Sequence, residues 1–210
     1  MKALDFIATS LNRIDDEPNK ALAAEIVKSK RQDWILELVK NLNNKDKNIQ
    51  SDCIKVLYEI GEHRGADMIA PYYKDFGKLL NSKNNRLVWG AMIALDHIAS
   101  ENPKGIFEIL PHIMTAIDNG SVITIDHGVG ILAKLAAKSE FSPTAFPLLI
   151  EQLKRCPIKQ LPMYAEETID SIDAEKQNEF IDTLESRIAE IEKDSQKNRI
   201  TKIIKKLKNK

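Results

Sequence analysis

The sequence predicts an all-α fold in which about five antiparallel helix pairs stack into a solenoid, as a single domain spanning residues 1–210. Three observations predict it: apolar segments that recur at a nearly constant spacing, short polar breaks between helices, and a composition poor in the aromatic and turn residues that sheets use. Aromatic residues make up 6% of the chain, and Gly and Pro number eight each. Sheets usually draw on more aromatic side chains and more turn residues than this.

The recurring segments are CIKVLYEIG, AMIALDHIA, GVGILAKLA and AEETIDSID. They begin at Cys53, Ala91, Gly128 and Ala165, so the spacing is 38, 37 and 37 residues. The residues in the first column are all small. The column four positions on is large and apolar: Leu57, Leu95, Leu132 and Ile169. The column three further on is large again: Ile60, Ile98, Leu135 and Ile172. Such spacing places one buried stripe on each helix, and the small column predicts close helix approach.

A second helix is predicted after each of the first three segments, over residues 68–80, 106–117 and 143–153. Pro111 and Pro147 share a position near the start of this helix, where the missing N–H is tolerated. Pro71 falls outside that column, so the first of these helices starts earlier or kinks. Ser142 is predicted as the N-cap in front of Pro143. Polar turn-formers such as Asn81–Asn85 separate the pairs.

The ends of the array are predicted as caps. Residues 1–18 form an N-terminal capping helix, with the helix itself over residues 2–12. The repeats occupy residues 19–192, and residues 193–210 form a basic C-terminal capping helix. Helices over 21–28 and 34–42 make the first pair, and helices over 178–191 and 198–207 close the stack. One helix pair cannot bury its apolar faces alone, which is why stacking is expected.

The pattern resembles the HEAT-repeat family, a HEAT-like or armadillo-type α-solenoid. The resemblance is carried by residues 85–88 running into Ala91 and the Ala94-Leu95-x-x-Ile98 stretch, and by Asn48-Ile49 running into residues 56–61. It covers about residues 19–192. The resemblance implies a right-handed α-α superhelix and a concave face lined by the second helices. The repeat period departs from the longer eukaryotic-type pattern, which leaves an armadillo-like label open.

Six residues are predicted to line that concave face through the resemblance: Tyr72, Tyr73, His112, Glu151, Lys154 and Arg155. The alternative interpretation is that each is an ordinary solvated helix residue.

Two Asp-His pairs, at 96–97 and 126–127, invite a metal interpretation. Adjacent helix residues point about 100° apart and chelate one ion poorly, and the pairs fall in different columns, so stacking is not expected to join them. No metal-binding spacing such as HExxH or CxxC occurs, and no cofactor is expected. Gly128 and Gly130 interrupt a helical run, for which close packing is favoured over a ligand approaching the backbone.

Charge and cysteine usage limit the partners and the compartment. Acids and bases balance at 31 each, which argues against a dedicated nucleic-acid surface. The start of the chain lacks the features of a signal peptide, and no apolar stretch is long enough to span a membrane. Cys53 and Cys156 are expected to be reduced and buried. These observations predict a cytoplasmic protein.

The C-terminal end is polarised. Residues 164–194 are rich in acids, and every charged residue from Lys197 onward is basic. A helical stripe of Ile200, Ile203, Ile204 and Leu207 runs through this tail. We interpret it as a capping helix with its cations at the favoured helix end. The alternative is a basic helix that binds a membrane surface or a partner.

The leading functional hypothesis is a protein-binding scaffold or adaptor whose partner is another protein or a peptide, with no catalysis. An enzymatic alternative is a HEAT-like alkylpurine DNA glycosylase. That family places its catalytic Asp in a Trp-Asp-x-Val-Asp stretch, which is missing here: Gly90 follows Trp89, and Asp126 lies between Ile125 and His127. A third possibility is a structural or regulatory subunit that assembles through its terminal helices.

Overall fold

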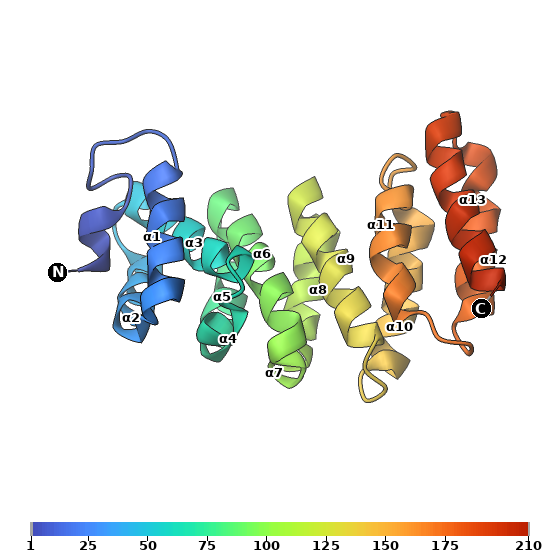
Figure 1. Ribbon diagram of the computed structural model, residues 1–210, viewed down its shortest axis with the longest axis horizontal. Helices are drawn as coiled ribbons and strands as arrows, with labels where there is room; N and C mark the ends of the chain where they lie inside the picture. The colour runs from blue at the N-terminus through green and yellow to red at the C-terminus, as the bar shows by residue number, and fades with distance from the viewer. Residues whose placement is uncertain (1, 210) are drawn as a thin grey trace. The chain divides into compact units, whose positions relative to one another are not determined.

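The computed structural model describes residues 2–209, and this part of the chain is helical with no strand (Figure 1). The chain divides into two compact units, Met1–Gly128 and Val129–Lys210. Each unit is described by itself below. None of the described helices combines the length and the apolar run that crossing a bilayer demands.

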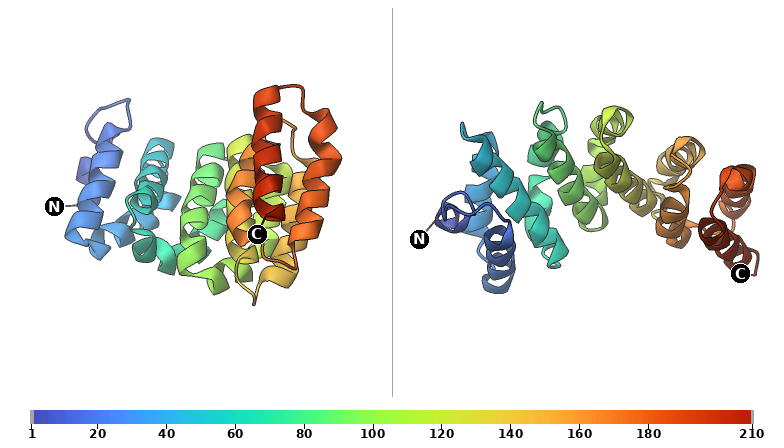
Figure 2. Two further views of the ribbon diagram at one scale, coloured as in Figure 1. Left: turned by 45° about the vertical axis from the view of Figure 1, so that its right-hand side comes forward. Right: turned by 90° about the horizontal axis from the view of Figure 1, so that it is seen from above.

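The first unit contains two layers of helices (Figures 1 and 2). One layer consists of α1 (Glu17–Ser29), α3 (Lys47–Glu62), α6 (Asn85–Glu101) and the beginning of α9 (Val122–Ala136). Helix α3 packs against both α1 and α6. These are the first helices that the repeat predicts, each extended by a few residues toward its N-terminus.

The second layer is more broken. It consists of α2 (Gln32–Lys40), α4 (Ala66–Ile69), α5 (Tyr73–Leu79), α7 (Pro103–Glu108) and α8 (Leu110–Asn119). A 3-10 turn over Ala70–Tyr72 carries Pro71 at its start and separates α4 from α5. The predicted kink at Pro71 is therefore confirmed. Pro111 lies in the first turn of α8, as expected for a residue without an N–H.

The repeat columns are buried. Cys53, Ala91 and Ala165 have no exposed surface, and all eight residues of the two large apolar columns are buried. The small residues allow close approach: a Cβ on Gly90 would lie 2.7 Å from Ile54 of α3, and one on Gly128 would collide with Ile117 of α8. The packing interpretation of Gly128 is therefore confirmed.

The second unit contains α10 (Ser142–Arg155), α11 (Leu161–Thr168), α12 (Gln177–Arg187) and α13 (Asp194–Lys208). Helix α12 packs on α10, and α13 packs on α11 and α12. The apolar stripe of α13 is buried: Ile200, Ile203, Ile204 and Leu207. This burial favours the capping interpretation, because the apolar face of α13 is used within the fold.

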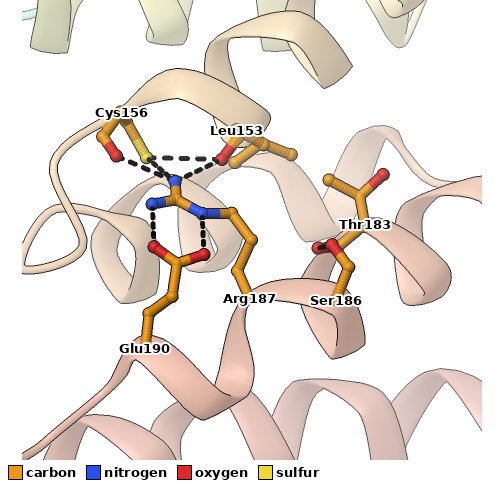
Figure 3. Close-up of polar contacts among 6 residues, drawn as sticks. All are labelled: Leu153, Cys156, Thr183, Ser186, Arg187 and Glu190. Atoms are coloured by element: carbon orange, nitrogen blue, oxygen red, sulfur yellow. Dashed lines mark hydrogen bonds and ion pairs between the residues drawn. The ribbon is translucent and has the colours of Figure 1, made fainter.

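Arg187 closes the C-terminal end of α10 (Figure 3). Its Nη1 donates hydrogen bonds to the carbonyl oxygens of Leu153 at 2.9 Å and Cys156 at 2.8 Å. Its Nε and Nη2 bind both carboxylate oxygens of Glu190, at 3.0 and 2.8 Å. Carbonyls in the last turn of a helix have no intrahelical partner, so the guanidinium supplies one.

The N-terminal cap differs from the sequence expectation. The helix expected over residues 2–12 is only a 3-10 turn over Ala3–Phe6, because the following backbone is held by side chains instead. Ala8 N donates to Asn19 Oδ1 at 2.9 Å, and Thr9 N donates to an Asp52 carboxylate oxygen at 2.7 Å.

The start of α10 also differs from the sequence expectation, in two ways. Phe141 is the N-cap, so Ser142 is the first helical residue and Pro143 the second. The expected Ser142 cap is therefore wrong by one position. Pro147 lies inside α10 and not near its start. Helix α10 tolerates it because the carbonyl left without a partner belongs to Pro143, which is itself an exposed residue.

Candidate functional site

A groove of about 710 Å³ lies in the first unit. We call it the amino-terminal groove. It is bounded by the loop of residues 8–16 and by the N-terminal halves of α1, α3 and α6. Its walls include Asn12, Asp16, Lys55, Tyr58, Arg86 and Trp89. Because α3 packs between α1 and α6, the first turns of three helices meet along this groove.

A second groove of about 450 Å³ adjoins the first at Trp89, which lines both. We call it the turn groove. It is bounded by the polar turn before α6, the end of α8 and the start of α9. Its walls are rich in amides and hydroxyls: Asn81, Ser82, Asn85, Asn119, Ser121 and Thr124. Groups of this kind can donate and accept hydrogen bonds with a peptide backbone.

Exposed aliphatic side chains flank both grooves. Ile14 is fully exposed and lines the amino-terminal groove, with Leu11 half exposed in the same loop. Val122 and Ile123, which are 52% and 42% exposed, lie between two residues of the turn groove. Exposed aliphatic residues that cluster beside a groove are typical of a contact surface.

Ion pairs hold the interior of the amino-terminal groove. Lys55 Nζ lies 2.9 Å from Asp16 and 2.6 Å from Glu59, and it sits 4.8 Å from the centroid of the Tyr58 ring. Burial alone would lower the pKa of Lys55, but hydrogen bonds to Glu59, Tyr58 and Asp16 outweigh it and raise that pKa. Lys55 is therefore charged at any physiological pH and keeps the first turn of α1 fixed to α3.

The carboxylates of the groove are already engaged. Asp52 accepts from Thr9 N at 2.7 Å and from Asn19 Nδ2 at 2.8 Å. Asp15 pairs with Arg13 at 2.7 Å, and this hydrogen bond lowers the pKa of Asp15. Hydrogen bonding to Lys55 likewise lowers the pKa of Asp16. These acids stabilise the groove wall.

Three of the six residues predicted from the sequence lie in the second layer of the first unit. Tyr72 ends the 3-10 turn, Tyr73 begins α5, and His112 is exposed on α8. Tyr73 donates its hydroxyl to Glu108 Oε2 at 2.6 Å. Lys74 pairs with the other oxygen of Glu108 at 2.7 Å. Tyr73 therefore belongs to a small polar cluster between α5 and α7.

The other three predicted residues, Glu151, Lys154 and Arg155, are exposed on α10 in the second unit. Arg155 Nη1 lies 3.7 Å from Glu151 Oε1, one helical turn away. None of the six predicted residues lines either groove. Their role on a concave face stays a prediction.

The two Asp-His pairs behave differently from the sequence expectation. One residue of each pair meets the other across helices, since His127 Nδ1 lies 2.9 Å from Asp96 Oδ2. The expectation was wrong for these two residues, because His127 of α9 faces Asp96 of α6 although the pairs fall in different columns. Among the described residues, no group of three or more His, Cys, Asp or Glu side chains could hold a metal ion.

Both cysteines are free thiols and both are buried, as expected. Burial raises the pKa of Cys53 to about 12. Burial also raises the pKa of Cys156, against the opposing charge of Arg187 nearby. Thiols with raised pKa values are poor nucleophiles, so these two are packing residues.

Sequence reasoning missed both grooves. Trp89 is half-buried and lines the two grooves. The available signal was the position of Arg86 and Trp89 directly after the polar turn of residues 81–85. A large aromatic residue in the first turns of a repeat helix is placed at the edge of the helix layer.

No protein-family model matches the sequence, and no curated protein matches it significantly. Solved structures of designed repeat proteins do resemble the fold. An engineered protein matches with a TM-score of 0.63 and 17% identity over 100% of this chain and 98% of its own. A designed armadillo repeat protein in complex with the peptide (KR)4 matches with a TM-score of 0.67 and 15% identity over 88% and 86%.

A computationally designed armadillo repeat protein for modular peptide recognition matches with a TM-score of 0.63 and 15% identity over 91% of this chain and 94% of its own. At these identities the likeness concerns the fold alone. Together with the buried repeat columns, it shows that the chain has an armadillo/HEAT-type helical-repeat fold.

Proposed function

We propose that this protein is a binding scaffold that takes an extended polypeptide segment in the amino-terminal groove and the adjoining turn groove, without catalysis. The observation that carries the proposal is the pair of grooves that meet at Trp89 between exposed aliphatic side chains. Such an aromatic anchor surrounded by polar groups is typical of polypeptide-binding surfaces.

The walls fit an extended chain better than a compact ligand. The grooves run past several helix ends and present amide and hydroxyl groups between apolar side chains. An extended peptide alternates backbone hydrogen-bonding groups with side chains, which matches that arrangement. The designed armadillo proteins of the same fold are described as recognising peptides, which supports this class of partner.

Selection from a random peptide library, followed by fluorescence anisotropy with the selected peptides, tests the proposal. Ile14→Ser combined with Val122→Ser removes exposed aliphatic surface beside each groove and should weaken binding by roughly ten-fold. Leu36→Ser is the matched control, because Leu36 is also an exposed aliphatic residue but lies on α2 outside both grooves. It should leave the affinity unchanged.

Trp89→Ala should weaken the same peptides further, with a thermal melt to confirm that the variant stays folded. Failure to select any peptide would contradict the scaffold proposal. Peptides that bind equally to the groove variants but are lost with Tyr72→Ala or His112→Ala would contradict the placement in the grooves and favour the second layer.

A further inference from the structure

Four cations lie at the starts of α3 and α6, two helices that border the grooves. Lys45 and Lys47 lie at the start of α3, and Lys83 and Arg86 lie at the start of α6. All four are exposed. Within residues 2–209, the structure gives none of them an ion-pair partner. Arg86 lines the amino-terminal groove itself, Lys47 precedes the wall residue Asn48, and Lys83 follows the wall residue Ser82.

Helix geometry does not explain these cations. The N-terminal end of a helix carries a partial positive charge, so cations there are disfavoured and acids are favoured. Helix α1 follows this rule with Glu17 in its first turn, whereas α3 and α6 have no acidic residue there. Asp46 and Asn84 cap the backbone of α3 and α6, at 2.8 and 3.1 Å, and do not pair with the lysines.

Most of the charge left for a partner is therefore positive. Two of the three acids in the walls, Asp16 and Asp15, pair with Lys55 and Arg13, and Asp52 is held by hydrogen bonds from Thr9 N and Asn19. The four cations are not neutralised in this way. Unpaired charge beside a groove sets which charged partner is accepted and how fast it associates.

We infer that the grooves bind an acidic polypeptide segment, whose carboxylates meet Lys45, Lys47, Lys83 and Arg86 while its apolar side chains meet Trp89, Ile14 and Val122. The inference rests on the proposed function and names the charge of its partner. A nucleic acid fits less well, because a phosphate backbone would leave the exposed aliphatic side chains beside the grooves without apolar contacts.

Three short labelled peptides of equal length test the charge. Each has leucine at every third position, and the remaining positions are all glutamate, all glutamine or all lysine. In low salt the glutamate peptide should bind at least about ten-fold more tightly than the other two, and added salt should weaken it. The triple variant Lys47→Glu, Lys83→Glu, Arg86→Glu should lose that preference and bind the lysine peptide instead.

A matched control reverses the same number of positive charges on another helix. The triple variant Lys202→Glu, Lys205→Glu, Lys206→Glu reverses three exposed lysines of α13 and should leave the affinity for the glutamate peptide within about two-fold. Equal loss in both triple variants would show an effect of net charge alone and would overturn the inference.

The remaining outcomes separate the two proposals. If the glutamine or lysine peptide binds as tightly as the glutamate peptide and Trp89→Ala abolishes that binding, the acidic partner is wrong while the scaffold stands. If none of the three binds but library-selected peptides do, the inference is also overturned. Equal competition by a single-stranded oligonucleotide would assign the cations to nucleic acid and would overturn it as well.

Discussion

The paired cations of the second unit and the unpaired cations at the starts of α3 and α6 are used in opposite ways. In the second unit, Arg187 holds the end of α10, Arg199 pairs with Glu166 at 2.6 Å, and Lys208 pairs with Glu185 at 2.8 Å. These contacts join helices far apart in sequence. Around the grooves, Lys83 and Arg86 contact no acid within the described residues.

The difference separates structural charge from charge available to a partner. Even the unpaired lysines of α13 have a structural explanation, because Lys205 and Lys206 lie in its last turn, where the helix dipole favours cations. Lys47 and Arg86 lie in first turns, where the same dipole disfavours them. Position relative to the helix end therefore distinguishes two groups that composition alone treats as equal.

The largest effect is expected from Arg187→Met, which retains the aliphatic stem and removes the guanidinium. The carbonyls of Leu153 and Cys156 would lose their partner, and Glu190 would lose its counter-ion. The free energy of unfolding should fall by about 3 kcal/mol, measured by urea denaturation. Arg86→Met is the control and should change it by less than about 0.5 kcal/mol. Equal effects would end the distinction between the two groups.

A smaller effect is expected where a paired cation is exposed. Arg199→Ala removes the ion pair with Glu166 and should lower the stability by less than about 1 kcal/mol, an effect that high salt should reduce.

The pH dependence of stability tests the ion pair between Arg199 and Glu166 as well. The hydrogen bonds that Glu166 accepts from Arg199 lower the pKa of Glu166 from its ordinary value of 4.5. The pair's contribution is therefore complete above pH 4.5 and declines as the pH falls through the lowered pKa. Arg199→Ala should remove that part of the acid sensitivity, as measured by melting temperature against pH. An unchanged profile would show that the pair contributes nothing.

The sequence predicted the repeat and the core because both depend on local periodicity. The Cys53, Ala91, Gly128 and Ala165 column needed only residue size and spacing, and the structure buries all four. Arg187 could not be predicted in this way, since an arginine in a polar helix is usually solvated and its partners lie 31 and 34 residues earlier. The grooves depend on how helix ends meet the loop of residues 8–16, which periodicity does not describe.

The smallest expected effect is an increase in stability. Lys47→Glu combined with Arg86→Glu places acids in the first turns of α3 and α6, where the helix dipole favours them. The protein should become slightly more stable, with a rise in melting temperature of about 1–3 °C in low salt. Lys205→Glu combined with Lys206→Glu should lower the melting temperature by a similar amount, because these residues lie in the last turn of α13.

A gain in stability together with a loss of affinity for the glutamate peptide would show that the groove cations oppose the fold and serve binding. A loss of stability in the groove double variant would mean that Lys47 and Arg86 stabilise the helix ends after all, and the contrast with Arg187 would no longer distinguish binding residues from structural ones.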